Sequence, residues 1–586
     1  MNEYRTHNCG ELRKEEVGQE VKISGWVQTV RDLGGVVFID IRDQYGITQV
    51  VVSGNDSEVD FASRIPNEST VCVLGTVRLR SEDTINKNIP TGEIEIFAKE
   101  IKILGKRLNN LPFEINTDKE VREDLRLQYR FLDLRNEKIK NNIILRAKIL
   151  QYLRNQMIER GFLEVQTPIL TSSSPEGARD YLVPSRVHPG KFYALPQAPQ
   201  QFKQLLMVSG IDKYFQIAPC FRDEDARADR APGEFYQLDM EMAFATQEDV
   251  FEVMEKVIYN TFTKFSDKNV AEYPFPRIPY KEAMFKYGTD KPDLRNPLII
   301  QDVTEIFQNL EFNAFKGKIV RVISVPNVGN QPRSFFDGMT EFAINKCGAK
   351  GLAWLRVNED RTLQGPIAKF ITDEAREKML KDTNSNPGSA IFFIAEKKGI
   401  VEILAGQIRQ ELGIRLDILE KDVFKFCWIV DFPMYELSDE GKIEFSHNPF
   451  SMPQGGLESL ENKNPLDILA YQYDIVCNGI ELSSGAVRNH DPEIMIKAFD
   501  IAGYDKNVIE EKFPALFNAF HYGAPPHAGI APGVDRMIML LTDEPSIREV
   551  IAFPMNSKAQ DLLMKAPGNV TKEQLREIHI KLDIKE

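Results

Sequence analysis

The segment 214–244 carries the densest group of side chains suited to chemistry. In YFQIAPCFR, Gln216 and Arg222 share one face of a predicted strand. In EFYQLDMEMAF, Asp239 and Glu241 share one face of a second strand, and the loop RDEDARADRAPGE between the two is dense in charge. We expect a hairpin with one apolar, buried face and one face that presents an arginine and two carboxylates. A solvated ion-pair hairpin is the alternative interpretation.

A lysine lies at the start of a predicted helix in LPQAPQQFKQLLMVSG. Pro199 lies near the first helical position and Gly210 lies past the end. Gln200 and Lys203 share one face of the first turn. Because the helix dipole favours anions at this end, a bound carboxylate would satisfy both the lysine and the free N–H groups. A lysine that extends into water is the alternative.

A carboxylate pair is predicted in DIVCNGIELSSGAVR. The Asn-Gly turn at 478–479 predicts a hairpin in which Asp474 faces Ser483. Asp474 and Glu481 then lie on one face as diagonal neighbours. Two carboxylates so placed repel each other unless a cation binds between them, and oxygen ligands suit a Mg²⁺ ion that bridges phosphates.

Two arginines near the C-terminal end complete the candidate set. Strand parity places Arg488 beside the carboxylate pair only if the chain bends near Gly485. In HAGIAPGVDRMIMLL, Gly529 and Gly533 precede an apolar helix, and Arg536 lies in its first turn. Glycines permit close backbone approach, and arginine offers phosphate a planar fork.

The elements that would position these residues fall into blocks along the chain. Five segments rich in Val and Ile near the N-terminus predict a barrel of the oligonucleotide-binding (OB) kind. A helix from about 137 to 160 precedes the strand FLEVQTP, and catalytic-looking segments lie on both sides of a stretch of mixed texture. The predicted blocks are the barrel at 1–105, a charged hinge at 106–135, the two halves of a catalytic domain at 136–287 and 421–560, an inserted domain at 288–420 and a C-terminal extension at 561–586.

Composition excludes several classes of protein. A chain of 586 residues is too long for one core, and no apolar run is long enough to cross a bilayer. The polar N-terminus lacks the apolar stretch of a signal peptide, and the six scattered cysteines predict neither disulfides nor a thiolate zinc site, so we expect a cytoplasmic protein without a membrane partner. The net charge of −14 means that any RNA would bind through a local surface.

Together these segments resemble the class II aminoacyl-tRNA synthetases, and within subclass IIb the bacterial aspartyl type. Motif 1 resembles the helix with FLEVQTP, motif 2 resembles FRDEDARADRAPGEF and motif 3 resembles GIAPGVDR. The signatures SPEGARDYLVPSR at 174–186 and QAPQQFKQ at 197–204 are very specific. The stretch with GAKGLAWLRV is similar to the inserted domain of the bacterial aspartyl enzymes. The resemblance implies an α+β multidomain protein with a five-stranded OB barrel, an antiparallel class II catalytic sheet and an inserted α/β domain.

The resemblance also implies roles for individual residues. Arg222 would hold the α-phosphate of ATP and Arg536 the distal phosphates, and these two with Glu481 are the expected catalytic residues. The implied ATP site comprises Arg222, Asp223, Glu224, Glu481, Gly533, Val534, Asp535 and Arg536. The implied Mg²⁺ ligands are Asp474 and Glu481. The residues implied to surround L-aspartate are Glu176, Gln200, Lys203, Asp239, His447 and Arg488, and those implied to read the anticodon are Arg31, Phe38, Gln49 and Glu95.

The implied reaction is the activation of L-aspartate with ATP, followed by transfer of aspartate to the 3′ end of tRNA-Asp by a homodimer. A form that also charges tRNA-Asn is the alternative, although Glu95 as an acceptor for cytosine favours discrimination. Specificity for asparagine or lysine would keep the fold, but Arg488 with Lys203 favours an anionic side chain. A catalytically inactive RNA-binding relative is disfavoured because the arginines and carboxylates are intact.

The sequence departs from the usual motifs at two places. RAPGEF stands where many bacterial relatives have RQPEF, so Ala231 replaces a polar nucleotide contact and Gly233 is extra. HNPF stands where many have HHPF, so Asn448 replaces a second histidine.

Overall fold

The computed structural model describes residues 2–117, 119–173, 178–230, 232–308, 310, 312–438 and 440–584. The chain divides into two compact units, residues 1–114 and residues 115–586. The boundary falls inside the segment 106–135 that we predicted as a hinge. No helix in the described part of the chain combines the length and the apolarity that a membrane span requires.

The first unit is a closed barrel with the strand order β1-β2-β3-β5-β4. Alternate residues of each strand, such as Val37, Ile39 and Ile41, are buried in one core, because successive side chains of a strand point to opposite faces. The predicted OB barrel is confirmed. Its elements are β1 (Glu20–Asp32), β2 (Val36–Arg42), β3 (Ile47–Ser53), α1 (Asp56–Ser63), β4 (Thr70–Leu79) and β5 (Ile94–Gly105).

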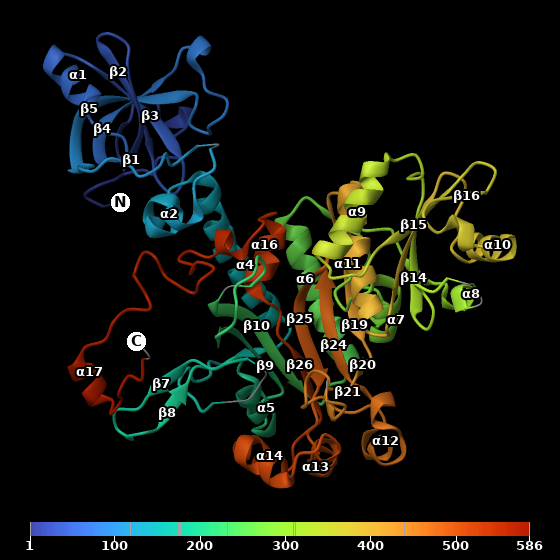
Figure 1. The fold of residues 1–586 in the computed structure, drawn as a ribbon. Coiled ribbons are helices and arrows are strands. Elements are labelled where there is room, and N and C mark those ends of the chain that lie inside the picture. The colour runs from blue at the N-terminus through green and yellow to red at the C-terminus, as the bar shows by residue number, and fades with distance from the viewer. Residues whose placement is uncertain are drawn as a thin grey trace. The chain divides into compact units, whose positions relative to one another are not determined.

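An eight-stranded sheet organises the second unit, with the order β12-β19-β24-β25-β26-β10-β9-β6 (Figure 1). The inner pairs are antiparallel, and the outermost pair at each edge is parallel. Strands from both sides of the stretch 288–420 join in this one sheet. The four strands that follow that stretch, β19, β24, β25 and β26, lie between β12 and the group β10, β9 and β6, which all precede it. The strands are β6 (Leu163–Glu164), β9 (Lys213–Arg222), β10 (Gly233–Ala243), β12 (Arg277–Pro279), β19 (Phe426–Val430), β24 (Gln472–Cys477), β25 (Ile480–Val487) and β26 (His527–Ile530).

One face of this sheet packs against three helices to form the largest core. The helices are α4 (Glu137–Glu159), α6 (Gln247–Phe265) and α16 (Val534–Leu541). Leu153 and Met157 of α4 are buried against Phe215 and Leu238 of the sheet, as the helical spacing predicted. The polar side chains of β9, β10, β24 and β25 therefore lie on the opposite face.

The stretch 288–420 forms a second, five-stranded sheet with its own helices and two separate cores. Figure 1 shows it, coloured from yellow-green to gold, beside the larger sheet. Its elements are β13 (Ile300–Asp302), α8 (Thr304–Gln308), β14 (Ile319–Val325), α9 (Arg333–Asn345), β15 (Ala353–Val357), β16 (Leu363–Gln364), α10 (Asp373–Asp382), β17 (Ala390–Glu396) and α11 (Ile400–Arg415). We call this stretch the inserted segment.

The arginine-rich part of the predicted hinge packs onto the second unit. Arg126 binds Asp133 and Glu549, and the buried Arg130 donates hydrogen bonds to the backbone carbonyls of residues 548, 551 and 552. These contacts attach α2 (Glu123–Gln128) and α3 (Arg130–Asp133) to residues some 420 positions later.

The second unit contains further helices and strands outside its two large sheets. The helices are α5 (Gln200–Val208), α7 (Tyr280–Tyr287), α12 (Gly456–Asn462), α13 (Pro492–Ile501), α14 (Lys506–Lys512), α15 (Pro514–Phe520) and α17 (Lys572–Glu577). The strands are β7 (Leu182–Pro184), β8 (Phe192–Ala194), β11 (Asn269–Val270), β18 (Val423–Phe424), β20 (Phe432–Pro433), β21 (Tyr435–Leu437), β22 (Ile443–Phe445) and β23 (Leu469–Ala470).

Candidate active site

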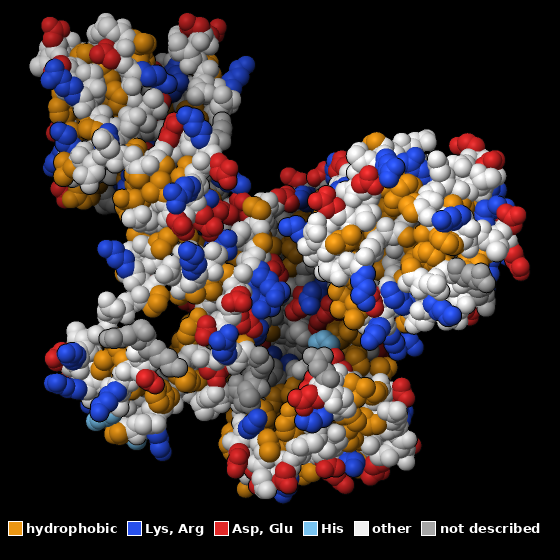
Figure 2. Space-filling model, viewed as in Figure 1, with side chains coloured by type: hydrophobic (Ala, Val, Ile, Leu, Met, Phe, Trp, Pro, Cys, Tyr) orange, Lys and Arg blue, Asp and Glu red, His pale blue; other side chains and the backbone are white. Residues whose placement is uncertain are grey.

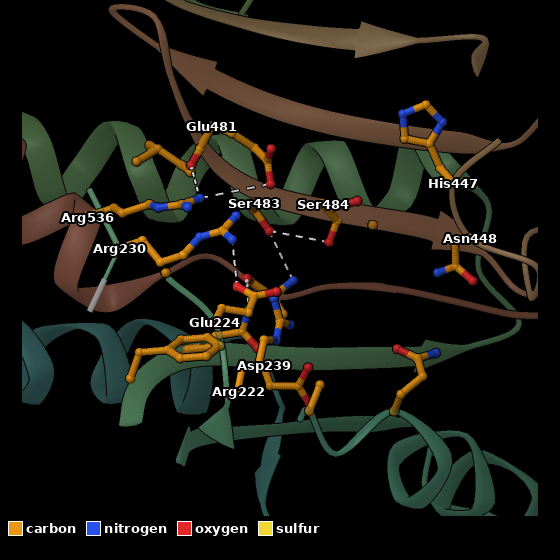
Figure 3. Close-up of a pocket in the computed structure, with 18 of the residues that line it drawn as sticks. Arg222, Glu224, Arg230, Asp239, His447, Asn448, Glu481, Ser483, Ser484 and Arg536 are labelled. Carbon is orange, nitrogen blue, oxygen red and sulfur yellow. Dashed lines mark hydrogen bonds and ion pairs between the residues drawn. The ribbon is translucent and has the colours of Figure 1, made fainter. Parts of the chain in front are cut away.

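A cavity of about 550 Å³ lies on the polar face of the larger sheet. Its lining comes from α5, β9, β10, β25, the loop at 444–450 and the start of α16. Figure 2 shows a hollow in the second unit where basic and acidic side chains gather. In Figure 3, Arg230 and Arg536 lie at one end of the cavity, and His447 and Asn448 lie at the other.

Four charged side chains form a buried cluster at the base of the cavity. Lys203 Nζ lies 2.6 Å from Asp239 Oδ1 and 3.2 Å from Glu241 Oε2. Arg488 donates from Nε to Glu241 Oε1 at 2.8 Å and from Nη2 to Glu241 Oε2 at 3.1 Å. None of the four side chains is more than 2% exposed, and the two cations and two carboxylates compensate one another. We call these residues the buried cluster.

Glu241 was not among the predicted site residues, although its spacing from Asp239 placed both on one face. Burial by itself would raise the pKa of Glu241, but Arg488 and Lys203 outweigh burial and lower it to about 2. Glu241 is therefore an anion at neutral pH, and it orients Arg488. The sequence signal for Glu241 was its position two residues after Asp239, which places the two side chains on the same face of the strand.

Several polar atoms of this region have no hydrogen-bond partner among the described residues. Two of them, Asp239 Oδ2 and Gln200 Nε2, are buried. The third is Arg488 Nη1, because the hydrogen bonds of that guanidinium come from Nε and Nη2. Burial raises the pKa of Asp239, an effect that the Lys203 ammonium opposes. A buried polar atom without a partner is costly, so the cavity fits a ligand that offers both donors and acceptors.

The basic end of the cavity contains three arginines with different partners. Arg230 binds Glu224 at 2.6 Å, and Arg536 donates to the backbone oxygen of Glu481 at 2.6 Å. Arg222 makes only a 3.3 Å hydrogen bond to the backbone oxygen of Gln197 and a stacking contact with Phe235, with no carboxylate partner among the described residues. An uncompensated guanidinium at this position can bind an anion such as a phosphate.

The predicted carboxylate pair is present, but the register of its hairpin differs from our prediction. A bulge between Ile475 and Val476 shifts the pairing, so Asp474 faces Ser484 rather than Ser483. Asp474 Oδ1 is buried and has no hydrogen-bond partner in the described chain. Burial, and next the charge of Glu481, raise the pKa of Asp474 well above its usual range.

The carboxylate pair fits a Mg²⁺ ion that also binds phosphate. Within the described ranges no group of three or more His, Cys, Asp or Glu side chains could hold a metal by itself. Mg²⁺ is commonly held by one or two carboxylates together with substrate phosphates and water, so two carboxylates beside the arginine end match this requirement.

Two glycines allow close packing in this region, and the first of them, Gly529, makes room for the buried cluster. A Cβ on Gly529 would lie 1.9 Å from Glu241 Oε2, and a Cβ on Gly485 would lie 2.4 Å from the ring of Tyr473. Beyond Gly485, the backbone N–H of Arg488 donates to the carbonyl of His527 at 2.8 Å. The described strand β25 keeps a regular register on both sides of Gly485, so the bend expected there is not present; the register shift lies instead between Glu481 and Ser483. One extra residue at that shift changes the strand parity, and Arg488 and Glu481 line the same cavity.

The loop with His447 and Asn448 lies opposite the arginines. The His447 ring packs edge-on against Phe432, and its Nδ1 lies 2.8 Å from Ser446 Oγ. Asn448 accepts a hydrogen bond from the backbone N–H of Phe450 at 2.9 Å. The asparagine in HNPF therefore stabilises the turn of its own loop.

The structure does not bring every predicted nucleotide contact into the cavity. Asp223 is exposed and forms a backbone bridge with Arg179, and Val534 is buried in the core. Asp535 lines the cavity, but its carboxylate binds Arg146 and the backbone N–H of Tyr236. Glu176 and Ala231 lie outside the described residues.

The four predicted anticodon residues lie close together in the barrel unit, where Arg31 is exposed, Phe38 and Glu95 are partly exposed and Gln49 is buried. Arg31 donates to Gln49 Oε1 at 3.2 Å, and Gln49 donates to Glu95 Oε2 at 3.0 Å. Phe38 is paired with Arg31 across strands β1 and β2 and is partly exposed. The result is a polar network beside an aromatic ring, an arrangement typical of single-strand nucleic-acid recognition.

Comparisons with known proteins agree with this geometry. The family described as tRNA synthetases class II (D, K and N) matches residues 122–557, and the OB-fold nucleic acid binding domain family matches residues 21–104. The aspartate–tRNA(Asp/Asn) ligase of Rickettsia bellii is 60% identical and covers 99% of this chain and 98% of its own. The aspartate–tRNA ligase of Streptomyces avermitilis is 58% identical and covers 99% of each chain.

The solved structure of the Entamoeba histolytica aspartyl-tRNA synthetase has the same fold. It aligns with a TM-score of 0.57 at 19% identity, over 94% of this chain and 91% of that chain. The family match over most of the chain and the identity to full-length relatives lead to one assignment. The chain belongs to the class II tRNA synthetases, and within them to the aspartate–tRNA ligases.

Proposed function

We propose that this chain activates L-aspartate with ATP and then transfers the aspartyl group to tRNA-Asp. The observation that carries the proposal is the buried cluster, in which Glu241 holds Arg488 with one guanidinium nitrogen left for a ligand. Together with Lys203, this arginine suits a carboxylate side chain better than an amide or an ammonium. Asp239 Oδ2 and Gln200 Nε2 would receive the ammonium and the carboxylate at the α-carbon.

The proposed first step is an in-line displacement at the α-phosphorus of ATP. An oxygen of the α-carboxylate of aspartate forms the new bond to the α-phosphorus, and the bond between the α-phosphorus and the pyrophosphate leaving group breaks. No protein nucleophile is therefore required. Arg222 would bind the α-phosphate and Arg536 the distal phosphates, and positioning with charge neutralisation supplies the rate enhancement. Asp474 and Glu481 would hold Mg²⁺, which adds charge neutralisation at the phosphates.

The experiment that tests the proposal is pyrophosphate–ATP exchange without tRNA. We expect exchange that depends on aspartate and that is not supported by asparagine or lysine, because Arg488, with one nitrogen left for a ligand, and Lys203 suit a side-chain carboxylate. Exchange with asparagine at a comparable kcat/KM would contradict the assigned amino acid. No exchange with any amino acid would contradict the proposed activity.

We assign the barrel to anticodon binding, which gives a prediction for Phe38. Phe38→Ala should lower kcat/KM for aspartylation of tRNA, since one base–aromatic stack contributes roughly 1–3 kcal/mol. Phe38 is not part of the barrel core, so its loss should leave the fold intact. Pyrophosphate exchange should stay near wild type, because the barrel is a separate compact unit. Equal losses in exchange and charging would show that Phe38 acts structurally.

The network at Glu95 gives a prediction about tRNA choice. The anticodons of tRNA-Asp and tRNA-Asn differ at position 36, where C is replaced by U. Glu95 is fixed by Gln49 and could accept from the cytosine amino group, a contact that uracil cannot offer. We therefore expect tRNA-Asp to be preferred, by a graded difference of roughly 1–3 kcal/mol. Comparable kcat/KM values on purified tRNA-Asp and tRNA-Asn transcripts would favour the dual specificity named for the Rickettsia relative.

We further propose that the enzyme is a cytoplasmic homodimer. Ile158 at the end of α4, Leu163 in the edge strand β6, and Ile169 and Leu170 after that strand are each 47–56% exposed, and we expect a second copy to cover them. The largely buried cysteines, among them Cys9, Cys427 and Cys477, are consistent with a reducing compartment.

A further inference from the structure

Lys291, which the sequence did not mark, contacts the carboxylate pair. It lies just after α7, in the first residues of the inserted segment. Its Nζ is 3.1 Å from Glu481 Oε2 and 3.1 Å from Asp290 Oδ2. The side chain is 41% exposed, so the contact lies at the rim of the site rather than in the core.

Among the residues that the structure describes, Lys291 has the cationic nitrogen nearest to the Glu481 carboxylate. Among the described residues only Lys291 and Arg536 place a cationic nitrogen within 4 Å of it, and the Arg536 distance is 3.9 Å. Arg536 instead binds the backbone oxygen of Glu481. Because Asp474 and Glu481 repel each other, the ammonium at Glu481 offsets part of the negative charge of the pair.

Two glycines of the inserted segment bring the backbone just before Lys291 into close contact with α11. Gly288 has a left-handed conformation with φ of +69°, and a Cβ on it would lie 2.3 Å from the carbonyl oxygen of Glu402 in α11. A Cβ on Gly406 of α11 would lie 2.5 Å from the carbonyl oxygen of Gly288. No side chain larger than hydrogen fits at either position without a shift of the backbone.

Arg409 of α11 fixes the next residues of the same stretch. This buried arginine donates to the carbonyl oxygens of Leu298, Asp293 and Asn296 at 2.6, 3.1 and 2.7 Å. The Asn296 side chain in turn donates to the carbonyl oxygen of Arg409 at 2.8 Å. Residues on both sides of Lys291 are therefore attached to α11, which Figure 1 shows beside α7.

We propose that Lys291 is a positioning residue of the adenylation site, held in place by the inserted segment, and that it competes with a divalent cation for the Glu481 carboxylate. This proposal rests on the proposed function, and it gives the inserted segment a role in aspartate activation. Before ATP binds, the Lys291 ammonium offsets the repulsion between the carboxylates of Asp474 and Glu481 and disfavours metal binding to them. The phosphates of ATP add ligands for the metal, so the competition is overcome when both bind together.

The first test measures Mn²⁺ binding to the full-length protein without ATP, by electron paramagnetic resonance of the free ion. Lys291→Met should bind Mn²⁺ at this site about tenfold more tightly than wild type, because a competing charge about 3 Å from the ligand oxygen is removed. Lys291→Arg should stay close to wild type. With saturating ATP the difference between Lys291→Met and wild type should shrink.

Two control variants identify the site and the specificity of the effect. Lys286→Met is the matched control, since Lys286 is 44% exposed and binds Glu282 at 2.7 Å just before Lys291 in the chain. It should leave Mn²⁺ affinity unchanged. Glu481→Gln should remove the tight binding seen in Lys291→Met, which assigns that binding to the carboxylate pair. Equal Mn²⁺ affinity in Lys291→Met, Lys286→Met and wild type would overturn the proposal.

A second test addresses the inserted segment. Gly406→Ala should displace the backbone at Gly288 and shift Mn²⁺ affinity towards that of Lys291→Met. Gly351→Ala is its control, because a Cβ there meets no atom within 4 Å. Asn296→Ala, which removes a bond to Arg409 without adding volume, is a second variant should Gly406→Ala fold poorly. Wild-type Mn²⁺ affinity in a folded Gly406→Ala or Asn296→Ala protein would overturn the role of the inserted segment. These tests require no turnover, so they are independent of aspartate-dependent exchange in the wild type.

Discussion

Arg488→Leu should nearly abolish aspartate activation while ATP binding is retained. Arg488 is oriented by two hydrogen bonds to Glu241 and has one nitrogen available to the ligand. The loss of charged hydrogen bonds to the substrate costs roughly 1.5–3 kcal/mol, and an uncompensated buried charge adds about 3–5 kcal/mol. A loss of about 4.5 kcal/mol in transition-state stabilisation, the lower end of this sum, corresponds to a fall of roughly two thousandfold in kcat/KM. Aspartate-dependent pyrophosphate exchange measures the loss of activation, and equilibrium ATP binding measures whether the nucleotide site is retained.

The control for this variant must separate activity from stability. Arg488→Leu leaves Glu241 buried without its main partner, so the free energy of unfolding should fall as well. Adding Glu241→Gln removes that charge and should recover stability without recovering exchange. A normal aspartate KM with normal turnover in Arg488→Leu would contradict the assignment of Arg488 to the substrate.

The depressed pKa of Glu241 also sets a pH dependence for stability. Its pKa is about 2 in the folded state against an ordinary value of 4.5, so the stabilising charge is fully present above about pH 4.5. It is lost as the pH falls from there towards 2. Arg488→Leu should weaken this acid dependence, because the main group that lowers the pKa is gone.

Arg222→Gln should reduce the turnover of pyrophosphate exchange by about 10²–10³-fold, the usual effect of removing one preorganised donor to a developing charge. Arg222 has no carboxylate partner among the described residues, so its charge is available to the α-phosphate. Aspartate should still bind near its wild-type affinity, because the buried cluster does not include Arg222.

Arg230→Gln is the matched control for Arg222→Gln. Arg230 lies in the loop after β9 and lines the same cavity, but Glu224 compensates its charge at 2.6 Å. Its replacement should affect turnover far less. Similar losses in the two variants would mean that the general positive charge of the loop matters rather than a specific contact of Arg222.

The sequence alone determined those parts of the protein that depend on local patterns. The five barrel strands follow alternation of Val and Ile between turn residues, and α4 follows helical spacing that ends before Gly161. The polar face of the β9–β10 hairpin was predicted for the same reason, since alternation fixes which side chains point the same way. The family assignment also came from contiguous motifs, and the matches to the synthetase and OB-fold families confirm it.

The tertiary structure decided the contacts between distant residues and the details of register. Arg488 and Glu241 are 247 positions apart, and only the path of β25 beside β26 and β10 brings them together. The bulge at Ile475 changed the partner of Asp474, because one extra residue shifts a strand pairing without leaving a clear mark in its composition. Lys291 reaches Glu481 through the packing of Gly288 on Gly406, a contact between two segments more than a hundred residues apart. Side-chain types and spacing indicate which chemistry a chain can perform, whereas burial and long-range packing decide which charges face a ligand and which neutralise one another.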